Sequence, residues 1–198
     1  MTRYLLPCCI LALATPAHAQ WRLTAAHGIG TSYHDASDPA DPDGSEFHAD
    51  RLRTWTLALA RQHAGWRIAV EGRRATADLT EDGSTSAVTA RNVLRAWGVT
   101  AELSRRAAGQ PGGPSLWLGA GAGFERWAFT VSGGSPAWRL AGRLHAEADV
   151  PISPHWTGLA RGELGVGGQA FGASDLPDGF VTHTPERLQL YLGIGLVP

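Results

Sequence analysis

Three side chains that could do chemistry together alternate along one short stretch of the chain: His145, Glu147 and Asp149. In an extended strand, residues two apart lie on the same face, about 7 Å from each other. An imidazole and two carboxylates on one face could bind a divalent cation or exchange protons. Arg139 and Arg143 share this parity, however, and guanidinium groups beside carboxylates favour an ion-pair network. We therefore predict no catalytic residue, no metal site and no cofactor.

A second candidate is an acidic loop. Asp41, Asp43 and Asp50 occupy the third, fifth and twelfth positions of a calcium-binding loop that would begin at Pro39. Proline cannot supply the first carboxylate ligand, and no helical period flanks the segment. We interpret it as a solvated acidic connection.

The elements that would position these residues are strands, because the hydropathy pattern repeats every two residues. From Arg187 to Leu196, leucine and isoleucine alternate with polar residues or glycine. No segment shows a sustained helical period. The same alternation is clearest at 54–59, 66–71, 97–103, 116–125 and 138–150, and weaker runs at 21–33 and 156–170 complete a count of eight strands. Residues 87–96 are predicted to be strand as well and lead into the run at 97–103.

The connections between these strands alternate between short and long. Short links occupy 61–65, 104–114 and 151–155, and longer polar links occupy 34–50, 78–86, 130–136 and 172–185. The long links are rich in Pro, Gly, Asp and Ser. This alternation predicts an up-and-down antiparallel meander with all the short links at one end.

The first nineteen residues have the pattern of a signal peptide. Arg3 supplies a positive charge, residues 5–14 supply an apolar core, and Ala17-His18-Ala19 is a small-x-small cleavage site. We predict a signal peptide at 1–19 and one domain at 20–198.

Composition narrows the class of protein. The 198 residues are 43% hydrophobic, which excludes a disordered chain. Their formal net charge is −1, and all 17 basic residues are arginine, without a basic block. We therefore exclude nucleic acid as a partner. Cys8 and Cys9 are the only cysteines and lie in the predicted signal peptide, so the exported domain would have no disulfide.

Periodicity alone does not decide which face of the strands meets water. In a soluble, lipocalin-like periplasmic barrel the apolar face would point inward, whereas in a transmembrane barrel it would meet lipid and charged residues would fill the lumen. Aromatic residues gather near both ends of the predicted strands, as the two interfacial girdles of a membrane protein do. The short-link end has Trp21, Trp66, Trp117 and Trp156, and the long-link end has Tyr33, Trp127, Phe129, Trp138 and Phe171. We therefore predict an all-β fold, an eight-stranded antiparallel up-and-down transmembrane β-barrel.

The polar face of these strands would line a narrow lumen. It carries six basic and six acidic residues, and balanced charge suits a closed interior, because an unpaired buried ion is costly. The predicted lumen ion-pair network is Arg67, Glu71, Arg73, Glu102, Glu125, Arg139, Arg143, His145, Glu147, Asp149, Arg161, Glu163 and Arg187. Inward glycines, among them Gly119 and Gly195, would leave room for the long arginine side chains. We predict a polar, charge-paired plug rather than an open pore.

Taken together, these features resemble a known family. A signal peptide, eight amphipathic strands, short turns at one end and long polar loops at the other make residues 20–198 similar to the small OmpA/OmpX/OmpW-type outer-membrane barrels of Gram-negative bacteria. The resemblance implies a place in the cell outer membrane, assembly by the barrel-assembly machinery, a monomer, and a structural or interaction role in envelope integrity or surface recognition. Such barrels usually end in an aromatic residue that the assembly machinery recognises, whereas this chain ends Leu196-Val197-Pro198.

Two other functions stay open within this fold. Some small barrels are enzymes that modify lipid A, and the deacylases among them carry a His-x-Ser pair on the lipid-facing wall, which this sequence lacks. His27 has the outward parity of the first strand, but a bulge that changes its register is the better interpretation. Passage of small solutes, as in a porin or in the OmpW manner, would require an apolar path through the lumen, which six charge pairs disfavour. We expect a protein that is not an enzyme.

Six arginines interrupt the outward apolar pattern: Arg51, Arg53, Arg74, Arg91, Arg95 and Arg126. All lie toward the long-link end of their strands, where charge on the lipid-facing surface costs little. Guanidinium groups match phosphate oxygens in a bidentate geometry. We hypothesise an arginine collar that binds the phosphates of lipopolysaccharide, so that the expected partners are outer-membrane lipid and lipopolysaccharide.

Overall fold

The structure is a computed structural model that describes residues 20–33, 36–38, 40, 46–83, 85–129, 138–168 and 178–198. The predicted signal peptide lies outside these residues. Among them, no helix is both long and apolar enough to cross a membrane. The strands are β1 (Gln20–Tyr33), β2 (Ala36–Ser37), β3 (Glu46–His63), β4 (Trp66–Asp82), β5 (Ala87–Gly109), β6 (Ser115–Phe129), β7 (Trp138–Pro151), β8 (Trp156–Gly167), β9 (Val181–Thr182) and β10 (Glu186–Leu196).

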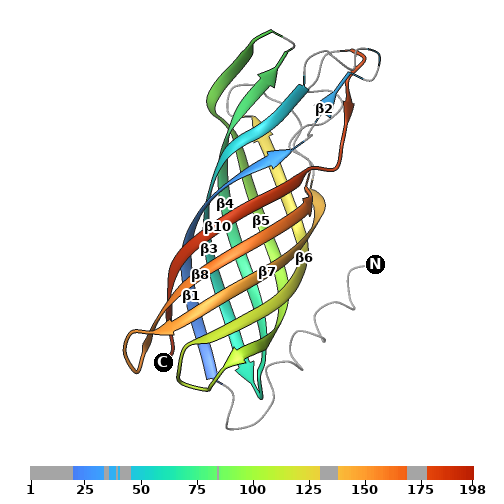
Figure 1. Ribbon diagram of the computed structural model, residues 1–198. Helices are drawn as coiled ribbons and strands as arrows, with labels where there is room; N and C mark the ends of the chain where they lie inside the picture. The colour runs from blue at the N-terminus through green and yellow to red at the C-terminus, as the bar shows by residue number, and fades with distance from the viewer. Residues whose placement is uncertain are drawn as a thin grey trace, which may run out of the picture.

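Eight of these strands close into one barrel, in which they run obliquely around a common axis (Figure 1). Each long strand pairs antiparallel with the next long strand in the chain, and β1 pairs with both β10 and β3, which closes the ring. The predicted eight-stranded up-and-down barrel is therefore confirmed. The short strands β2 and β9 pair with each other, and β2 also pairs with β3.

Two strands extend into the predicted links 34–50 and 78–86, and a third begins where the link 78–86 was predicted to end. β3 begins at Glu46, β4 continues to Asp82, and β5 begins at Ala87. These extensions carry the β4–β5 hairpin, drawn in green, beyond the end of the barrel (Figure 1). The alternation fades there because both faces of an extension outside the membrane can be polar. Register shifts between Asp50 and Arg53 on β3 and between Ala77 and Leu79 on β4 accompany this change.

The opposite end of the barrel has tight hairpins. β3 and β4 are joined by only Ala64 and Gly65, whose φ angles are 47° and 82°. Two consecutive positive φ angles give a turn that matches the right-handed twist of paired strands, and Gly65 adopts this conformation without a steric penalty.

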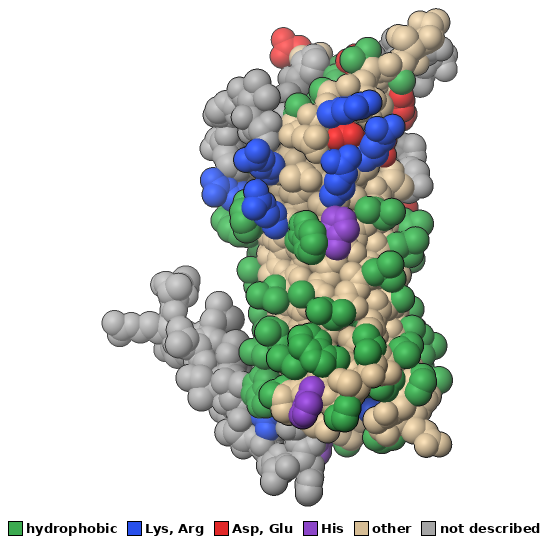
Figure 2. Space-filling view, turned by 90° about the vertical axis from the view of Figure 1, so that its left-hand side faces the viewer, with side chains coloured by type: hydrophobic (Ala, Val, Ile, Leu, Met, Phe, Trp, Pro, Cys, Tyr) green, Lys and Arg blue, Asp and Glu red, His purple; other side chains and the backbone are tan. Residues whose placement is uncertain are grey.

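The apolar face of the strands points outward. On β10, the exposed fractions of Leu188, Leu190 and Leu192 are 44%, 61% and 72%, whereas Arg187 and Gln189 are 8% and 3% exposed. Figure 2 shows a belt of hydrophobic side chains around the middle and lower part of one face. The soluble alternative, with an enclosed apolar core and a wet charged surface, is therefore wrong.

One part of the interior is apolar, which the sequence analysis did not predict. Leu52, Leu94 and Trp127 are buried together with small alanines contributed by β3, β4 and β5. Leu52 lies at the β3 register shift between Asp50 and Arg53, and Trp127 directly follows Arg126 on β6. Both positions are near the long loops, so the cluster occupies the loop end of the lumen. The polar plug occupies most of the remaining interior, together with a smaller apolar cluster of Ala26, Leu159 and Tyr191.

Candidate functional site

The charged lumen consists of two clusters of ion pairs. The larger one joins four arginines to four glutamates from six strands. Its ion pairs include Arg73–Glu163 at 3.0 Å, Arg161–Glu102 at 2.6 Å and Arg187–Glu125 at 2.5 Å, and Arg143 pairs with Glu125 as well. All eight side chains are no more than 8% exposed. The members are Glu71, Arg73, Glu102, Glu125, Arg143, Arg161, Glu163 and Arg187.

The smaller cluster lies toward the short-turn end and contains an arginine that the sequence analysis missed. Arg22 donates two hydrogen bonds to the Asp149 carboxylate, at 2.5 and 2.9 Å. Arg67 contacts both Asp149 and Glu147. Two positive and two negative charges therefore balance here, as four and four do in the larger cluster. The inward parity of Arg22, shared with Thr24 and Ala26, is the signal that could have identified it.

Arg139 has the inward parity that the sequence predicted, but it is only half-buried. It lies opposite Glu125 in the β6–β7 register. The two clusters described above contain six arginines, and the one that was not predicted is Arg22. The structure therefore places twelve of the thirteen predicted lumen residues at buried positions, and Arg139 is half-buried opposite Glu125.

The predicted trio of His145, Glu147 and Asp149 does share one wall. His145 Nε2 lies 3.0 Å from the Ser104 hydroxyl, while the two carboxylates are occupied by Arg22 and Arg67. The two carboxylates of the trio thus belong to the ion-pair network, and His145 lies beside them in contact with Ser104.

A different group of carboxylates comes close enough to hold a cation. Oxygens of Glu71, Glu102 and Glu163 all lie within 4.8 Å of one another. The guanidinium of Arg161 contacts all three, at 3.4, 2.6 and 2.6 Å. Arginine supplies the positive charge that a metal would otherwise bring.

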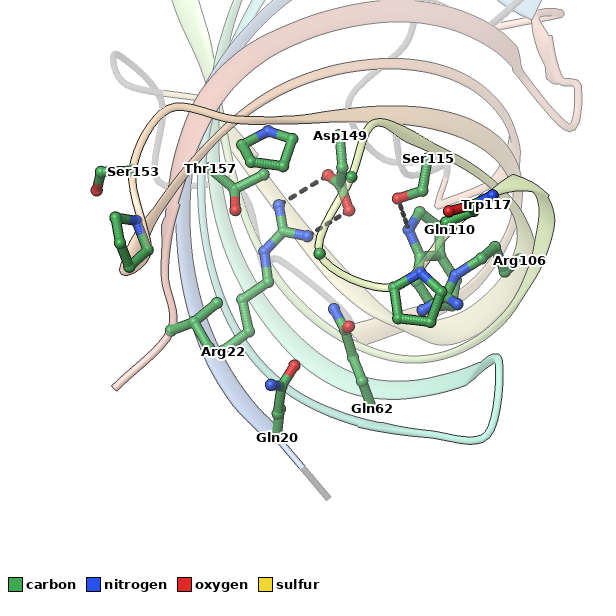
Figure 3. A pocket seen from close by; sticks show the side chains of 16 residues that line it. Gln20, Arg22, Gln62, Arg106, Gln110, Ser115, Trp117, Asp149, Ser153 and Thr157 are labelled. Carbon is green, nitrogen blue, oxygen red and sulfur yellow. Dashed lines mark hydrogen bonds and ion pairs between the residues drawn. The ribbon is translucent and has the colours of Figure 1, made fainter. Parts of the chain in front are cut away.

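The space that remains in the plug is small. A cavity of about 30 Å³ lies beside His145, Arg161 and Tyr191, which is room for about one water molecule. At the short-turn mouth a polar vestibule of about 460 Å³ opens, and the Arg22–Asp149 pair lies among its walls together with Gln62 (Figure 3). The vestibule therefore leads from the short-turn mouth to a packed interior.

The six predicted outward arginines are all exposed. They lie on four adjacent strands, β3 to β6, and Figure 2 shows basic side chains gathered above the hydrophobic belt on one face. Among the described residues of β7, β8, β10 and β1, no outward arginine lies at the loop end. The predicted collar is therefore an arc on one side of the barrel. We call these six residues the arginine arc.

The aromatic girdles are confirmed in part. Trp66 and Trp156 face outward at the short-turn end and Trp138 does so at the loop end, with exposed fractions of 45%, 44% and 57%. Trp117 and Trp127 were placed wrongly, because both point into the lumen with exposed fractions of 1% and 5%. The side chains of Tyr33 and Phe129, residue Phe171 and most of the acidic loop at 39–45 lie outside the described part of the structure.

Trp117 and Trp127 contact charged side chains inside the barrel. The guanidinium carbons of Arg67 and Arg106 lie 4.1 and 4.9 Å from the Trp117 ring centroid. The Trp127 indole donates to Glu125 at 3.3 Å. Indole can stack on guanidinium groups, so a tryptophan is compatible with a charged lumen. Outward and inward tryptophans cannot be distinguished by residue type alone.

Two loop-end tryptophans that the sequence analysis did not assign to a girdle also face outward. Trp55 and Trp97 are 63% and 54% exposed. Trp97 lies opposite Arg74, which follows Trp66 by eight residues on β4. Eight residues span about 26 Å along a strand, or about 20 Å along the axis at a tilt of about 40°. The axial distance between the Trp66 level and the Trp97 level therefore approaches the ~25 Å height of the lipid-facing band of a barrel.

The prediction of a bulge at His27 is wrong. β1 pairs with β3 and β10 without a register shift, and His27 faces outward between Trp55 and Leu192. Its ring contacts the Trp55 ring in a tilted arrangement, with a centroid separation of 4.5 Å and an interplanar angle of 39°. Its two cross-strand neighbours are apolar or aromatic, so neither offers a nucleophile.

Comparison with known proteins supports the same fold. No protein-family model matches this sequence, and no curated protein matches it either. Among solved structures, Neisserial surface protein A matches with a TM-score of 0.57 and 13% identity, covering 91% of this chain and 97% of that chain. OprG from Pseudomonas aeruginosa matches at 0.55 and 13%, covering 92% and 96%. Ail of Yersinia pestis matches at 0.51 and 12%, covering 92% and 100%.

At these identities the likeness concerns the fold, and in this chain the outward apolar belt and the charged interior agree with it. The chain is an eight-stranded β-barrel of the bacterial outer-membrane type.

Proposed function

We propose that this outer-membrane barrel is a non-conducting, non-enzymatic surface protein that binds lipopolysaccharide phosphates through its arginine arc. The observation that carries the proposal is the one-sided placement of all six arginines at the loop end of the lipid-facing surface. That end of an outer-membrane barrel faces the cell exterior. Arginine binds phosphate with paired, charge-assisted hydrogen bonds, and it is favoured where charge lies near an interface.

The proposed ligand class is a sugar that carries several anionic groups. Ail, one of the similar barrels, has been solved with the heparin analogue sucrose octasulfate. We propose an analogous class of ligand here, with phosphate in place of sulfate. The biological role that would follow is envelope integrity or recognition at the cell surface.

The test is lipopolysaccharide co-purification. The six arginines of the arc are replaced with glutamine, the barrel is extracted in mild detergent, and bound lipopolysaccharide is quantified per barrel. We expect a large loss of bound lipopolysaccharide, since each exposed phosphate contact depends on charge. Retention at the level of the unsubstituted protein would overturn the proposal.

A matched control exists at the other end of the barrel. Arg61 and Arg105 lie 5.5 Å from the ring centroids of Trp21 and Trp66, at the short-turn end. Replacing both with glutamine removes outward arginines that also contact tryptophan. These two arginines lie at the short-turn end, which is opposite to the end that would meet lipopolysaccharide. This variant should retain its bound lipopolysaccharide, and the heat-shifted gel mobility of both variants checks that each barrel is folded.

The other functions predict different measurements. A porin would conduct ions in a planar bilayer, whereas the packed plug supports no steady conductance. A lipid A-modifying enzyme would change the mass of lipid A when the protein is expressed in a Gram-negative host. We expect the lipid A mass to stay the same.

A further inference from the structure

Five outward residues at the loop end form one continuous row across the sheet. Trp55 on β3 lies opposite Arg74 on β4, which lies opposite Trp97 on β5. Trp97 lies opposite Arg126 on β6, which lies opposite Trp138 on β7. All five side chains are exposed. We call this alternation the tryptophan–arginine row.

In the strand register, each arginine of the row lies between two tryptophans. Side chains directly opposite each other on neighbouring strands have Cβ atoms about 4.5–5.5 Å apart. The guanidinium carbon of Arg74 lies 5.0 Å from the Trp97 ring centroid. Stacking on an indole orients a guanidinium group while its N–H edge stays free to donate. Because this side chain is already ordered, less conformational entropy is lost when a ligand binds to it.

Two more members of the arginine arc lie one step nearer the loops. Arg53 on β3 and Arg95 on β5 both lie opposite Thr76, two residues beyond Arg74 on β4. Diagonal neighbours of this kind are about 7–8 Å apart. Arg53, Arg74, Arg95 and Arg126 therefore form a zigzag over four adjacent strands.

The charge of this zigzag is not compensated by the protein. Among the residues that the structure describes, no carboxylate forms an ion pair with any of the four guanidinium groups. Arg53 donates to the side-chain oxygen of Asn92 at 3.2 Å, which leaves its charge available. Four positive charges beside an apolar belt attract an anionic group that is itself attached to a lipid.

Neighbouring arginines of the zigzag are evenly spaced diagonal neighbours, so a ligand can contact them as two pairs, each on two adjacent strands. Arg53 and Arg74 lie on β3 and β4, and Arg95 and Arg126 lie on β5 and β6. Corresponding members are two strands apart, or about 10 Å. Trp97 lies between Arg74 and Arg126 in the row, so an aromatic face separates these two guanidinium groups.

We infer that the tryptophan–arginine row, with Arg53 and Arg95, is a subsite for one diphosphorylated disaccharide glycolipid, the headgroup of lipid A. Each arginine pair binds one of its two phosphates, and the Trp97 indole packs against the apolar face of the sugar between them. The acyl chains then extend along the hydrophobic belt. This inference rests on the proposed function, and it adds the number of phosphates and the residues that bind them.

The experiment compares three lipids on the purified full-length barrel in detergent. Diphosphoryl lipid A, monophosphoryl lipid A and phosphatidylglycerol are titrated, and binding is followed by native mass spectrometry. We expect diphosphoryl lipid A to bind at least about tenfold more tightly than either lipid with a single phosphate. A lipid with one phosphate lacks the charge-assisted hydrogen bonds to one of the two arginine pairs. Equal binding of all three lipids would overturn the inference and indicate a general anionic-lipid surface.

Variants separate this subsite from the arc as a whole. Arg74→Gln/Arg126→Gln should remove the preference for two phosphates, and Arg74→Lys/Arg126→Lys should retain only part of it, because lysine keeps the charge but loses the bidentate geometry. Trp97→Leu should weaken diphosphoryl lipid A binding more than phosphatidylglycerol binding, and Trp97→Phe should restore it in part. Arg61→Gln/Arg105→Gln, at the opposite rim, should leave the preference unchanged.

The two proposals fail in different ways. If the variant without all six arginines keeps its lipopolysaccharide, the proposed function is wrong. If that variant loses lipopolysaccharide but Arg74→Gln/Arg126→Gln has the same lipid preference as the unsubstituted barrel, only the subsite is wrong. Heat-shifted gel mobility again shows that each variant is folded.

Discussion

Both oxygens of the Asp149 carboxylate accept hydrogen bonds from the guanidinium of Arg22, at 2.5 and 2.9 Å, across 127 positions of the chain. Arg22 lies on the first strand of the ring and Asp149 on β7, so the pair spans the lumen at its short-turn mouth (Figure 3). Both side chains are buried, with exposed fractions of 3% and 6%. A charge that lost its partner here would therefore remain away from bulk water.

Removing one partner of this pair should cost more than removing both. Asp149→Leu leaves Arg22 without its bidentate partner, and the expected loss in unfolding free energy is about 3–5 kcal/mol. Arg22→Met/Asp149→Leu should recover much of that loss, because no unpaired ion remains. Urea unfolding in lipid vesicles, followed by gel mobility, measures both. Additive effects of the two single substitutions would contradict a coupled pair.

Gly195 should be needed to accommodate Arg22. A Cβ at position 195 would lie 2.4 Å from Arg22 Nε, which forces the guanidinium away from Asp149. We expect Gly195→Ala to destabilise the barrel by about 1–3 kcal/mol. Gly162→Ala is the matched control, because its Cβ would meet only Leu190 Cδ2, at 3.8 Å on the outer face. Equal unfolding midpoints for the two variants would show that Gly195 has no such role.

Arg161 should act in place of a cation among three glutamates. In Arg161→Ala, the close oxygens of Glu71, Glu102 and Glu163 would lose the guanidinium that contacts all three. We expect the variant to unfold more easily and to be restabilised by millimolar Ca²⁺, since oxygen ligands in such a cluster suit that ion. The unsubstituted barrel and Arg161→Lys should show no such calcium dependence in their thermal unfolding. Insensitivity of Arg161→Ala to calcium would contradict this role.

The sequence predicted the barrel well because one physical rule, alternation between lipid and lumen, applies along most of each strand. It also placed Arg67, Glu71 and Arg143 on the inner wall, since the parity of a regular strand is unambiguous. It missed Arg22, because the alternation in 21–33 is weakened by alanine and glycine, which tolerate either face. Where β3 and β4 extend past the regular alternation, to Glu46 and Asp82, the rule no longer applies and these strands were predicted too short.

Residue type alone gave wrong predictions where the lumen and the lipid-facing surface accept the same side chain. Trp117 was assigned to an interfacial girdle, yet it stacks inside the lumen against Arg67 and Arg106. His27 was expected to be displaced by a bulge, yet it faces outward and its ring contacts Trp55. The tryptophan–arginine row was not foreseen at all, because it depends on the register between strands, which residue spacing within one strand does not encode.

The orientation of the tryptophans gives a direct test of this architecture. Two single-tryptophan variants are needed, one that retains only Trp97, which is 54% exposed on the outer face, and one that retains only Trp117, which is 1% exposed in the lumen. Both are reconstituted into vesicles that contain lipids with brominated acyl chains, which quench indole fluorescence on contact. We expect strong quenching of Trp97 and little quenching of Trp117, because the barrel wall separates the lumen from the lipid. Similar quenching of the two would mean that Trp117 faces the membrane, and the stacking of its ring with Arg67 and Arg106 could then not exist in the folded barrel.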